Sequence, residues 1–267
     1  MSQLMEYTSQ EMMALMAARE IHDDDIVFCG TGISMVAAMA AKHISAPRSI
    51  IFFETGGIDC ELRELPLSVG DPRVMVGTTI NAGLAESFAL LQNPRTGPRT
   101  VAILGAAQID PFGNLNSTCL GDYHRPRMRF PGAGGASDAA AYAGRVITFM
   151  VQERRRFVRR LDYVSSPGWP ENPQDRFRAG LTLPQDSLVI TDKAVFRFDS
   201  GSGRMYLSGH YPGITPADVA AAVGFEIETR RSREVPPPSA AEISLLREKI
   251  DPLGLIIKRI KSEKKSF

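Results

Sequence analysis

The chain has 267 residues, of which 43% are hydrophobic and 23% are charged, so it can bury the core of one large domain or two small ones. Its formal net charge of +1 does not indicate a nucleic-acid or membrane partner. The three cysteines lie far apart, with no CxxC pair and no histidine at metal-ligand spacing, which is typical of reduced thiols in a cytosolic protein without a metal site. The N-terminus lacks the basic region of a signal peptide, and no apolar run approaches the roughly 20 residues of a membrane span. We therefore expect a cytoplasmic protein.

The first sixty residues predict a strand–helix–strand unit. A cap at Thr8 and apolar residues at helical spacing predict a helix over 9–21. Residues 26–29 form a short continuous apolar run, as in a strand buried on both faces, and Gly30-Thr31-Gly32 ends it. A helix over 34–42 and a strand over 49–54 complete the unit.

The alternation continues through the middle of the chain. Residues 73–76, 100–104 and 146–151 are predicted strands, and 84–91 and 136–143 are predicted helices. Alternating strands and helices indicate an α/β fold, with an open, mainly parallel sheet covered by helices on both faces. The stretch 108–135 has little periodicity, and a loop of that length in a compact domain is usually functional.

The pattern changes after about residue 185. Short strands are expected over 188–191, 195–198 and 205–207, with a hairpin turn over 199–203. Thr215 and Pro216 predict the start of a short helix, and a last helix is expected over 240–250. We expect a single α/β domain over 1–257, followed by a basic, disordered tail over 258–267.

Glu54 is the most informative residue. It ends the apolar run 49–53, and Thr55, Gly56 and Gly57 follow it. Ligands of parallel sheets sit at the carboxyl ends of the strands, and glycines allow a ligand to approach the backbone closely. A carboxylate in that position can act as a covalent nucleophile toward an acyl group. The same pattern also suits an exposed acid at a strand-to-loop boundary, and the local sequence does not decide between the two interpretations.

Two glycine-rich runs precede predicted helices. Gly132, Ala133, Gly134 and Gly135 come just before residue 136, where free backbone N–H groups would favour an oxyanion or a phosphate. A tight turn at the start of a helix explains the same residues. Gly30-Thr31-Gly32 has the same two interpretations, and it lacks the full dinucleotide-binding pattern.

Three polar segments remain. In 108–116, the side chains of Gln108, Asn114 and Asn116 can fix a loop through hydrogen bonds, and Asn114 and Asn116 can also contact a ligand. The basic segment of His124, Arg125, Arg127 and Arg129 suits phosphates or a carboxylate substrate, and equally a solvated loop. The basic segment of 154–156 with Arg159 and Arg160 suits an acidic partner surface, the phosphates of a nucleotide or a salt-bridged edge in an oligomer. The four histidines form neither a triad nor a metal pattern.

Taken together, these segments resemble a known family. The chain is similar, over about residues 7–252, to the β subunits of family I CoA-transferases of the glutaconate type. The resemblance is carried by ordered matches in 30–32, 59–60, 68–71, 105–118, 121–124, 129–136, 162–169 and 204–207.

The resemblance implies a mechanism and a partner. Glu54-Thr55-Gly56 matches the position of the family's Glu-x-Gly motif, so Glu54 would be the nucleophile that carries CoA as a thioester. The run Gly132–Gly135 would donate N–H groups to the oxyanion, and Thr55, Gly56, 30–32, Gln108, Asn114 and Asn116 would shape the pocket. No bound cofactor is implied, because coenzyme A and acyl-CoA are substrates. An α subunit would be required in an α/β hetero-oligomer, and a glutaconate-type acid is the expected substrate.

Two other functions stay open on the same scaffold. Some relatives decarboxylate CoA thioesters or hydrolyse a carbon–carbon bond, and as a family they tend to lack the β-subunit glutamate. A non-catalytic paralogue that only binds acyl-CoA is the other possibility. The presence of Glu54 favours CoA transfer over both.

Overall fold

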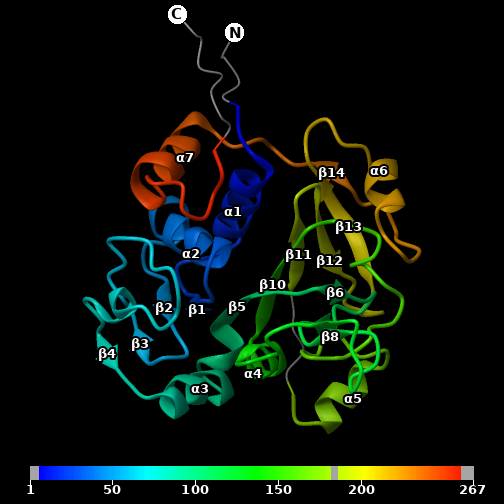
Figure 1. Cartoon of the computed structure of the whole chain (residues 1–267), viewed down its shortest axis with the longest axis horizontal. Helices are drawn as coiled ribbons and strands as arrows, with labels where there is room; N and C mark the ends of the chain where they lie inside the picture. The colour runs from blue at the N-terminus through cyan, green and yellow to red at the C-terminus, as the bar shows by residue number, and fades with distance from the viewer. Residues whose placement is uncertain (1–5, 182–185, 260–267) are drawn as a thin grey trace, which may run out of the picture.

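The computed structural model describes residues 6–181 and 186–259 (Figure 1). Within these residues the centre is a ten-stranded sheet in the order β14-β13-β12-β11-β10-β5-β1-β2-β3-β4. Its strands are β1 (Ile26–Phe28), β2 (Ile50–Phe52), β3 (Gly57–Ile58), β4 (Ile80–Asn81), β5 (Thr100–Gly105), β10 (Arg145–Met150), β11 (Leu188–Thr191), β12 (Ala194–Phe198), β13 (Met205–His210) and β14 (Arg233–Glu234).

The five central strands β2, β1, β5, β10 and β11 are parallel to one another. Antiparallel strands extend the sheet at both sides, β3 and β4 beyond β2, and β12 and β13 beyond β11. β14 returns parallel to β13. The predicted α/β fold with a mainly parallel sheet is therefore confirmed.

Helices cover both faces of the sheet. One face is covered by α1 (Ser9–Arg19), α2 (Ile33–Ile44), α7 (Ala240–Ser244) and the π-helix η3 (Leu245–Ile250). The other face is covered by α3 (Leu84–Gln92), α4 (Ala136–Tyr142) and α6 (Pro216–Ala221). A further short helix, α5 (Pro173–Arg178), follows the long loop after β10.

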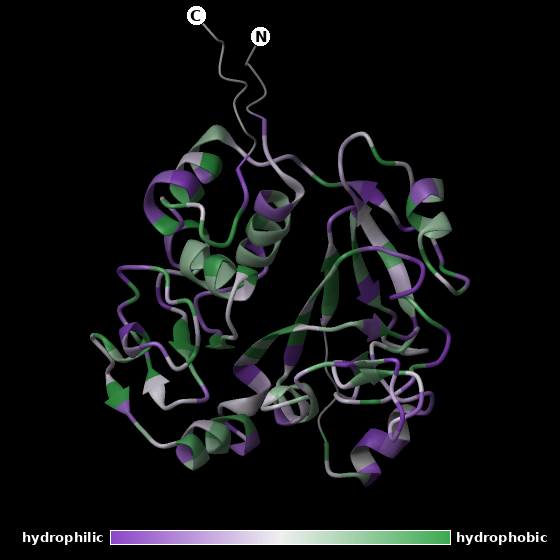
Figure 2. Cartoon of the chain, viewed as in Figure 1, coloured by the Kyte–Doolittle hydropathy of each residue, from purple (hydrophilic) through white to green (hydrophobic). Residues whose placement is uncertain are grey.

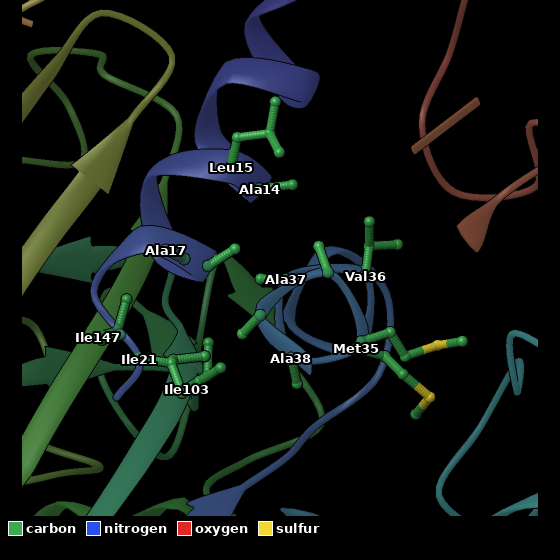
Figure 3. Packing of buried hydrophobic residues seen from close by; sticks show 14 of the residues in the cluster. Ala14, Leu15, Ala17, Ile21, Met35, Val36, Ala37, Ala38, Ile103 and Ile147 are labelled. Atoms are coloured by element: carbon green, nitrogen blue, oxygen red, sulfur yellow. The ribbon is translucent and has the colours of Figure 1, made fainter. Parts of the chain in front are cut away.

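The two cores follow from the alternation of side chains along each strand. In β5, Ile103 faces the α1 and α2 side, whereas Leu104 faces the α3 and α4 side. Both faces are apolar, so the central strands are hydrophobic along most of their length (Figure 2). Alanines such as Ala17 and Ala37 are fully buried where α1 packs against α2, above Ile103 and Ile147 (Figure 3).

The long loop 108–135 contains two short hairpins. β6 (Gln108–Ile109) pairs with β7 (Leu115–Asn116), and β8 (Cys119–Leu120) pairs with β9 (Met128–Arg129). Each strand of these hairpins has only two residues, which is too short to produce a periodic pattern in the sequence.

Several predicted boundaries were wrong. Residues 73–76 are not a strand, because Asp71 caps and Pro72 begins a 3-10 helix, η1 (Pro72–Met75). The strand predicted over 49–54 ends at Phe52, and the helix predicted over 9–21 ends at Arg19. The last helix is α-helical only to Ser244 and continues as η3 to Ile250. A second 3-10 helix, η2 (Gly97–Arg99), precedes β5.

The cap predicted at Thr215 is confirmed as a capping box with Asp218. Most of the predicted basic tail, residues 260–267, lies outside the described residues. Within the described ranges, no helix has both the length and the apolar character needed to cross a bilayer.

Candidate active site

Glu54 lies in a tight turn between two antiparallel strands. The backbone N–H of Phe53 donates to Gly57 O at 3.0 Å, and the N–H of Gly56 donates to Phe53 O at 3.0 Å. Glu54, Thr55 and Gly56 therefore form the turn that joins β2 to β3. Because β2 lies beside β1, which pairs with β5, the turn sits at the edge where these parallel strands have their carboxyl ends.

Gly56 is required by the turn itself. Its φ of +107° is one that residues with a side chain rarely adopt, and a Cβ built there would lie 1.8 Å from Ala82 O. The N–H of Ala82 in turn donates to Gly56 O at 2.9 Å. The close approach that the glycine allows is thus that of the protein's own backbone. The predicted role of Gly56 in admitting a ligand stays a prediction.

Thr55 fixes the turn on its other side. Its exposed side chain donates from Oγ1 to Val69 O at 2.9 Å. The turn is therefore held between the loop at Val69 and the segment at Ala82, which limits how far Glu54 can move.

The half-buried side chain of Glu54 reaches the start of α4. A Cβ built on Gly135 would lie 2.7 Å from Glu54 Oε2 and 2.4 Å from Phe88 Cζ. Gly135 is the residue that caps α4, and Phe88 lies in α3, which packs beside α4 (Figure 1). The structure thus brings together Glu54 and the glycine run 132–135, two features that are far apart in the sequence.

The glycine run presents free donors next to that carboxylate. Among the described residues, no hydrogen-bond acceptor is found for the backbone N–H of Ala133, Gly134 or Gly135. Gly132 and Gly134 have φ values of +101° and +51°, and a Cβ on either would meet no atom within 4 Å. Unpaired N–H groups beside a carboxylate suit an anion that forms there during acyl transfer.

Phe88 is a site residue that the sequence interpretation missed. Its ring lies 6.0 Å from that of Phe28, which in turn lies 5.3 Å from that of Phe52. The three rings pack against one another, and Phe88 lies beside Gly135. The helical pattern of 84–91 predicted that α3 exists, but nothing in it predicted that Phe88 faces Glu54.

Gly30-Thr31-Gly32 lies at the same edge, between β1 and α2. Gly32 caps α2 with a φ of +73°, and its Cβ side is open. Thr31 is exposed and Gly30 is half-buried. The position agrees with a residue that shapes a pocket, and that role stays a prediction.

Gln108, Asn114 and Asn116 hold loops together. The buried Asn116 donates to Gln108 Oε1 and Cys119 O, both at 2.7 Å, and accepts from the N–H of Thr118 at 3.0 Å. Asn114 donates to Asp110 Oδ2 at 2.8 Å and accepts from the N–H of Gly168 at 2.8 Å. These contacts are those of loop-fixing side chains, and the predicted contact with a ligand stays a prediction.

Two thiols lie near the turn but are not nucleophiles. Burial raises the pKa of Cys60 to about 12, and burial also raises the pKa of Cys29. A buried thiol with a raised pKa is a weak nucleophile at neutral pH. In the part of the chain that the structure describes, no group of three or more His, Cys, Asp or Glu side chains could hold a metal ion.

The chain matches known proteins over most of its length. A family model described as Coenzyme A transferase matches residues 10–222. The chain is 42% identical to the β subunit of glutaconate CoA-transferase of Acidaminococcus fermentans, covering 92% of this chain and 93% of that protein. It is 34% identical to the β subunit of 3-oxoadipate CoA-transferase of Pseudomonas knackmussii, covering 90% and 92%.

The fold agrees with these matches. The crystal structure of glutaconate coenzyme A-transferase from Acidaminococcus fermentans superposes with a TM-score of 0.90 at 40% identity, covering 96% of this chain and 99% of that chain.

Proposed function

The chain belongs to the coenzyme A transferase family, as a β subunit of family I, and on this premise we propose that Glu54 is the nucleophile of a two-subunit enzyme that moves CoA from an acyl-CoA to a dicarboxylic acid. The observation that carries the proposal is the placement of the Glu54 carboxylate against Gly135, beside unpaired N–H groups. Neither a metal nor a bound cofactor is required.

The proposed first half-reaction begins at the donor thioester. An oxygen of the Glu54 carboxylate attacks the thioester carbon of the donor, and the N–H groups of 133–135 stabilise the resulting oxyanion. The carbon–sulfur bond then breaks, which gives CoA thiolate and an anhydride between the acyl group and Glu54. The thiolate attacks the Glu54 carbonyl carbon, the donor acid leaves as its carboxylate, and CoA remains as a thioester of Glu54.

The second half-reaction reverses these steps with the acceptor acid. No proton is gained or lost overall, because the acceptor acid enters and the donor acid leaves as carboxylates, and CoA leaves and attacks as a thiolate. Thioester and anhydride are both activated, so the transfer needs no other source of energy.

A dicarboxylic acid of the glutaconate type is the proposed substrate. The two relatives described above are named for glutaconate and 3-oxoadipate, which are both dicarboxylic acids. None of the residues named around Glu54 in the described chain is cationic, so the second carboxylate of the acid would be bound elsewhere.

We assign that role to an α-type subunit. Residues 67–84 pack against the turn and carry exposed large apolar side chains. The exposed fractions are 53% for Leu67, 54% for Ile80 and 61% for Leu84. This segment includes Val69 and Ala82, which contact Thr55 and Gly56. An apolar surface beside the nucleophile suits a partner that completes the pocket.

The test uses the chain co-purified with its α-type subunit. After incubation with acyl-CoA, mass spectrometry should find the added mass of CoA on the peptide that contains Glu54, and Glu54→Gln should abolish both the adduct and transfer. The control is Glu86→Gln, an exposed acid in the first turn of α3, which should keep both. Normal transfer by Glu54→Gln would refute the nucleophile. Carbon dioxide or a ring-opened product formed without an acceptor acid would instead support one of the other reactions.

A further inference from the structure

Arg176, in α5, places its guanidinium group at the C-terminal end of α4. The residue is nearly fully buried, with 3% of its surface exposed. Its Nη2 donates to Ala140 O and Ala141 O, both at 2.9 Å, and its Nη1 donates to Gly168 O at 2.6 Å. The proposed chemistry at Glu54 gives this arginine no role.

The guanidinium group completes the hydrogen bonding of the last turn of α4. In a longer helix Ala140 O would accept from the N–H of Gly144, which instead donates to Gly97 O at 2.9 Å. Because the helix ends there, the carbonyls of Ala140 and Ala141 need a donor from elsewhere in the chain. Arg176 supplies it, and its positive charge suits the negative end of a helix.

Side-chain packing alone holds α4 only weakly. The helix has seven residues, too few to be stable in isolation. Its fully buried side chains are those of Ala139 and Ala140, and a methyl group buries little apolar surface. The hydrogen bonds at the ends of the helix therefore have a large share in fixing its position.

The third carbonyl that Arg176 binds belongs to a loop that is itself fixed. The N–H of Gly168 donates to Asn114 Oδ1 at 2.8 Å, and the N–H of Trp169 donates to Phe112 O at 2.7 Å. Arg176 therefore connects the end of α4 to a loop that is bonded on its other side to the turn of the β6–β7 hairpin.

The opposite end of α4 lies at the candidate active site. Gly135 caps the helix there, with the Glu54 carboxylate against it and with the N–H groups of 133–135, for which the described residues offer no acceptor. A helix of this length spans about 10 Å. A rotation of α4 at its C-terminal end would therefore shift the N–H groups at its start, and a misplacement of about 1 Å can lower a rate a hundredfold.

A buried arginine is a costly way to fill space. Burial lowers the pKa of Arg176 to about 10, so the side chain is still charged at neutral pH. Burying a charge costs free energy, and an apolar side chain would fill the same volume at a lower cost. Packing alone does not account for an arginine at this position, whereas donors aimed at three carbonyls do.

We propose that Arg176 is a positioning residue of the transfer reaction: it fixes the C-terminal end of α4, so that the N–H groups at the other end lie where the oxyanion forms. The proposal rests on the proposed function, because it explains how that site keeps its geometry. Arg176 itself does not touch the reacting atoms, since it binds the far end of the helix.

The experiment compares Arg176→Ala and Arg176→Lys with a control, all in complex with the α-type subunit. Lysine keeps the charge but not the planar set of donors. Arg19→Ala is the control, because Arg19 also donates to two backbone carbonyls, those of Pro236 and Pro237, and lies in α1 on the opposite face of the sheet. Steady-state kinetics give kcat and the KM for acyl-CoA, and hydrogen–deuterium exchange measures the opening of 136–143.

Arg176→Ala should lower kcat about tenfold to a hundredfold and leave the KM for acyl-CoA at the wild-type value, because the N–H groups act in the transition state. Guanidinium chloride, at a concentration too low to unfold the chain, should restore part of kcat, and the same concentration of sodium chloride should not. Arg176→Lys should fall between Arg176→Ala and wild type, and 136–143 should exchange faster in both variants. Arg19→Ala should lose stability but keep the wild-type kcat and the wild-type exchange of 136–143.

A wild-type kcat in Arg176→Ala, a rise in KM without a loss of kcat, or an equal loss of kcat in Arg19→Ala would overturn the positioning role. If Arg176→Ala does not fold, wild-type kcat and exchange in Arg176→Lys would overturn it instead. Should the wild-type complex transfer no CoA at all, the proposed function fails, and the exchange of 136–143 still tests whether Arg176 holds α4.

Discussion

Gly135 leaves the space that the carboxylate of Glu54 occupies. A methyl group at position 135 would lie 2.7 Å from Glu54 Oε2, closer than atoms in contact allow. Because Gly135, the N-cap of α4, has no side chain, the carboxylate of Glu54 in the β2–β3 turn can lie against it.

Gly135→Ala should therefore lower activity while the chain still folds. The backbone at Gly135 has a φ of −73°, which alanine adopts freely, and the atoms that it meets are the ends of two side chains, Glu54 and Phe88. We expect kcat to fall about a hundredfold, with a loss of about 1–3 kcal/mol in the free energy of unfolding. Steady-state kinetics and urea denaturation measure the two effects. Gly201→Ala is the control and should keep both values, because a Cβ there would meet only Asp199 Oδ1, at an ordinary contact distance of 3.5 Å.

Gly56→Ala should destabilise the turn that carries Glu54. The new methyl would lie 1.8 Å from Ala82 O, and that backbone atom cannot move aside as a side chain does. We expect a loss of about 3 kcal/mol or more in the free energy of unfolding, measured by chemical denaturation. Gly213→Ala, with a φ of +81° but no atom within 4 Å, should lose only about 1 kcal/mol. Equal losses in the two variants would contradict the close contact.

Asn116→Ala should destabilise the loop 108–121. Its fully buried amide bonds Gln108, Thr118 and Cys119, so the variant leaves buried polar atoms without partners. A loss of about 2–3 kcal/mol in the free energy of unfolding is expected, read from the denaturation midpoint. The exposed Asn93, which bonds only the N–H of Arg95, gives a matched control whose alanine variant should lose less than about 1 kcal/mol.

Acid should remove the stabilisation that Glu242 provides. Two hydrogen bonds from Arg19, each 2.8 Å long, lower the pKa of Glu242 from 4.5 to about 2, although its partial burial opposes the shift. A carboxyl whose pKa is lower in the folded chain stabilises fully above the unfolded value, and this stabilisation is lost as the pH falls from about 4.5 toward 2.

The free energy of unfolding of the wild type should therefore exceed that of Glu242→Gln by on the order of 2 kcal/mol at pH 7, and by much less at pH 3. Denaturation with urea at both pH values measures the difference. Glu248→Gln, which removes an exposed acid from η3, should follow wild type at each pH; a difference for Glu242→Gln that does not shrink at pH 3 would refute the assignment.

The sequence predicted what depends on local pattern. The central strands are short apolar runs because both faces of the sheet are buried, and caps such as Thr8 and Thr215 mark where helices begin. The strand predicted over 73–76 was wrong, because the apolar residues were weighed above the helix-start signal that precedes them. Pro72 after Asp71 starts a 3-10 helix, although the apolar residues that follow it resemble a strand.

The candidate site was only partly predictable for another reason. Glu54 and the glycine run each stood out through composition, but no periodicity relates them, because their contact depends on how α4 and the β2–β3 turn pack in three dimensions. Phe88 and Ala82 were missed because each is an ordinary residue until the fold places it against the turn.

The ion pairs between α1 and the last helical segment affect the order in which the chain folds. Glu11 bonds Arg247, and Arg19 bonds Glu242, across 236 and 223 positions of sequence. Glu11 is fully buried in this structure, and the segment that pairs with it through Arg247 lies at the far end of the described residues. Contacts of such long range form late in folding, because a long loop must close before they can form. The face of the sheet that α1 covers is therefore complete only when residues from both ends of the described chain are in place.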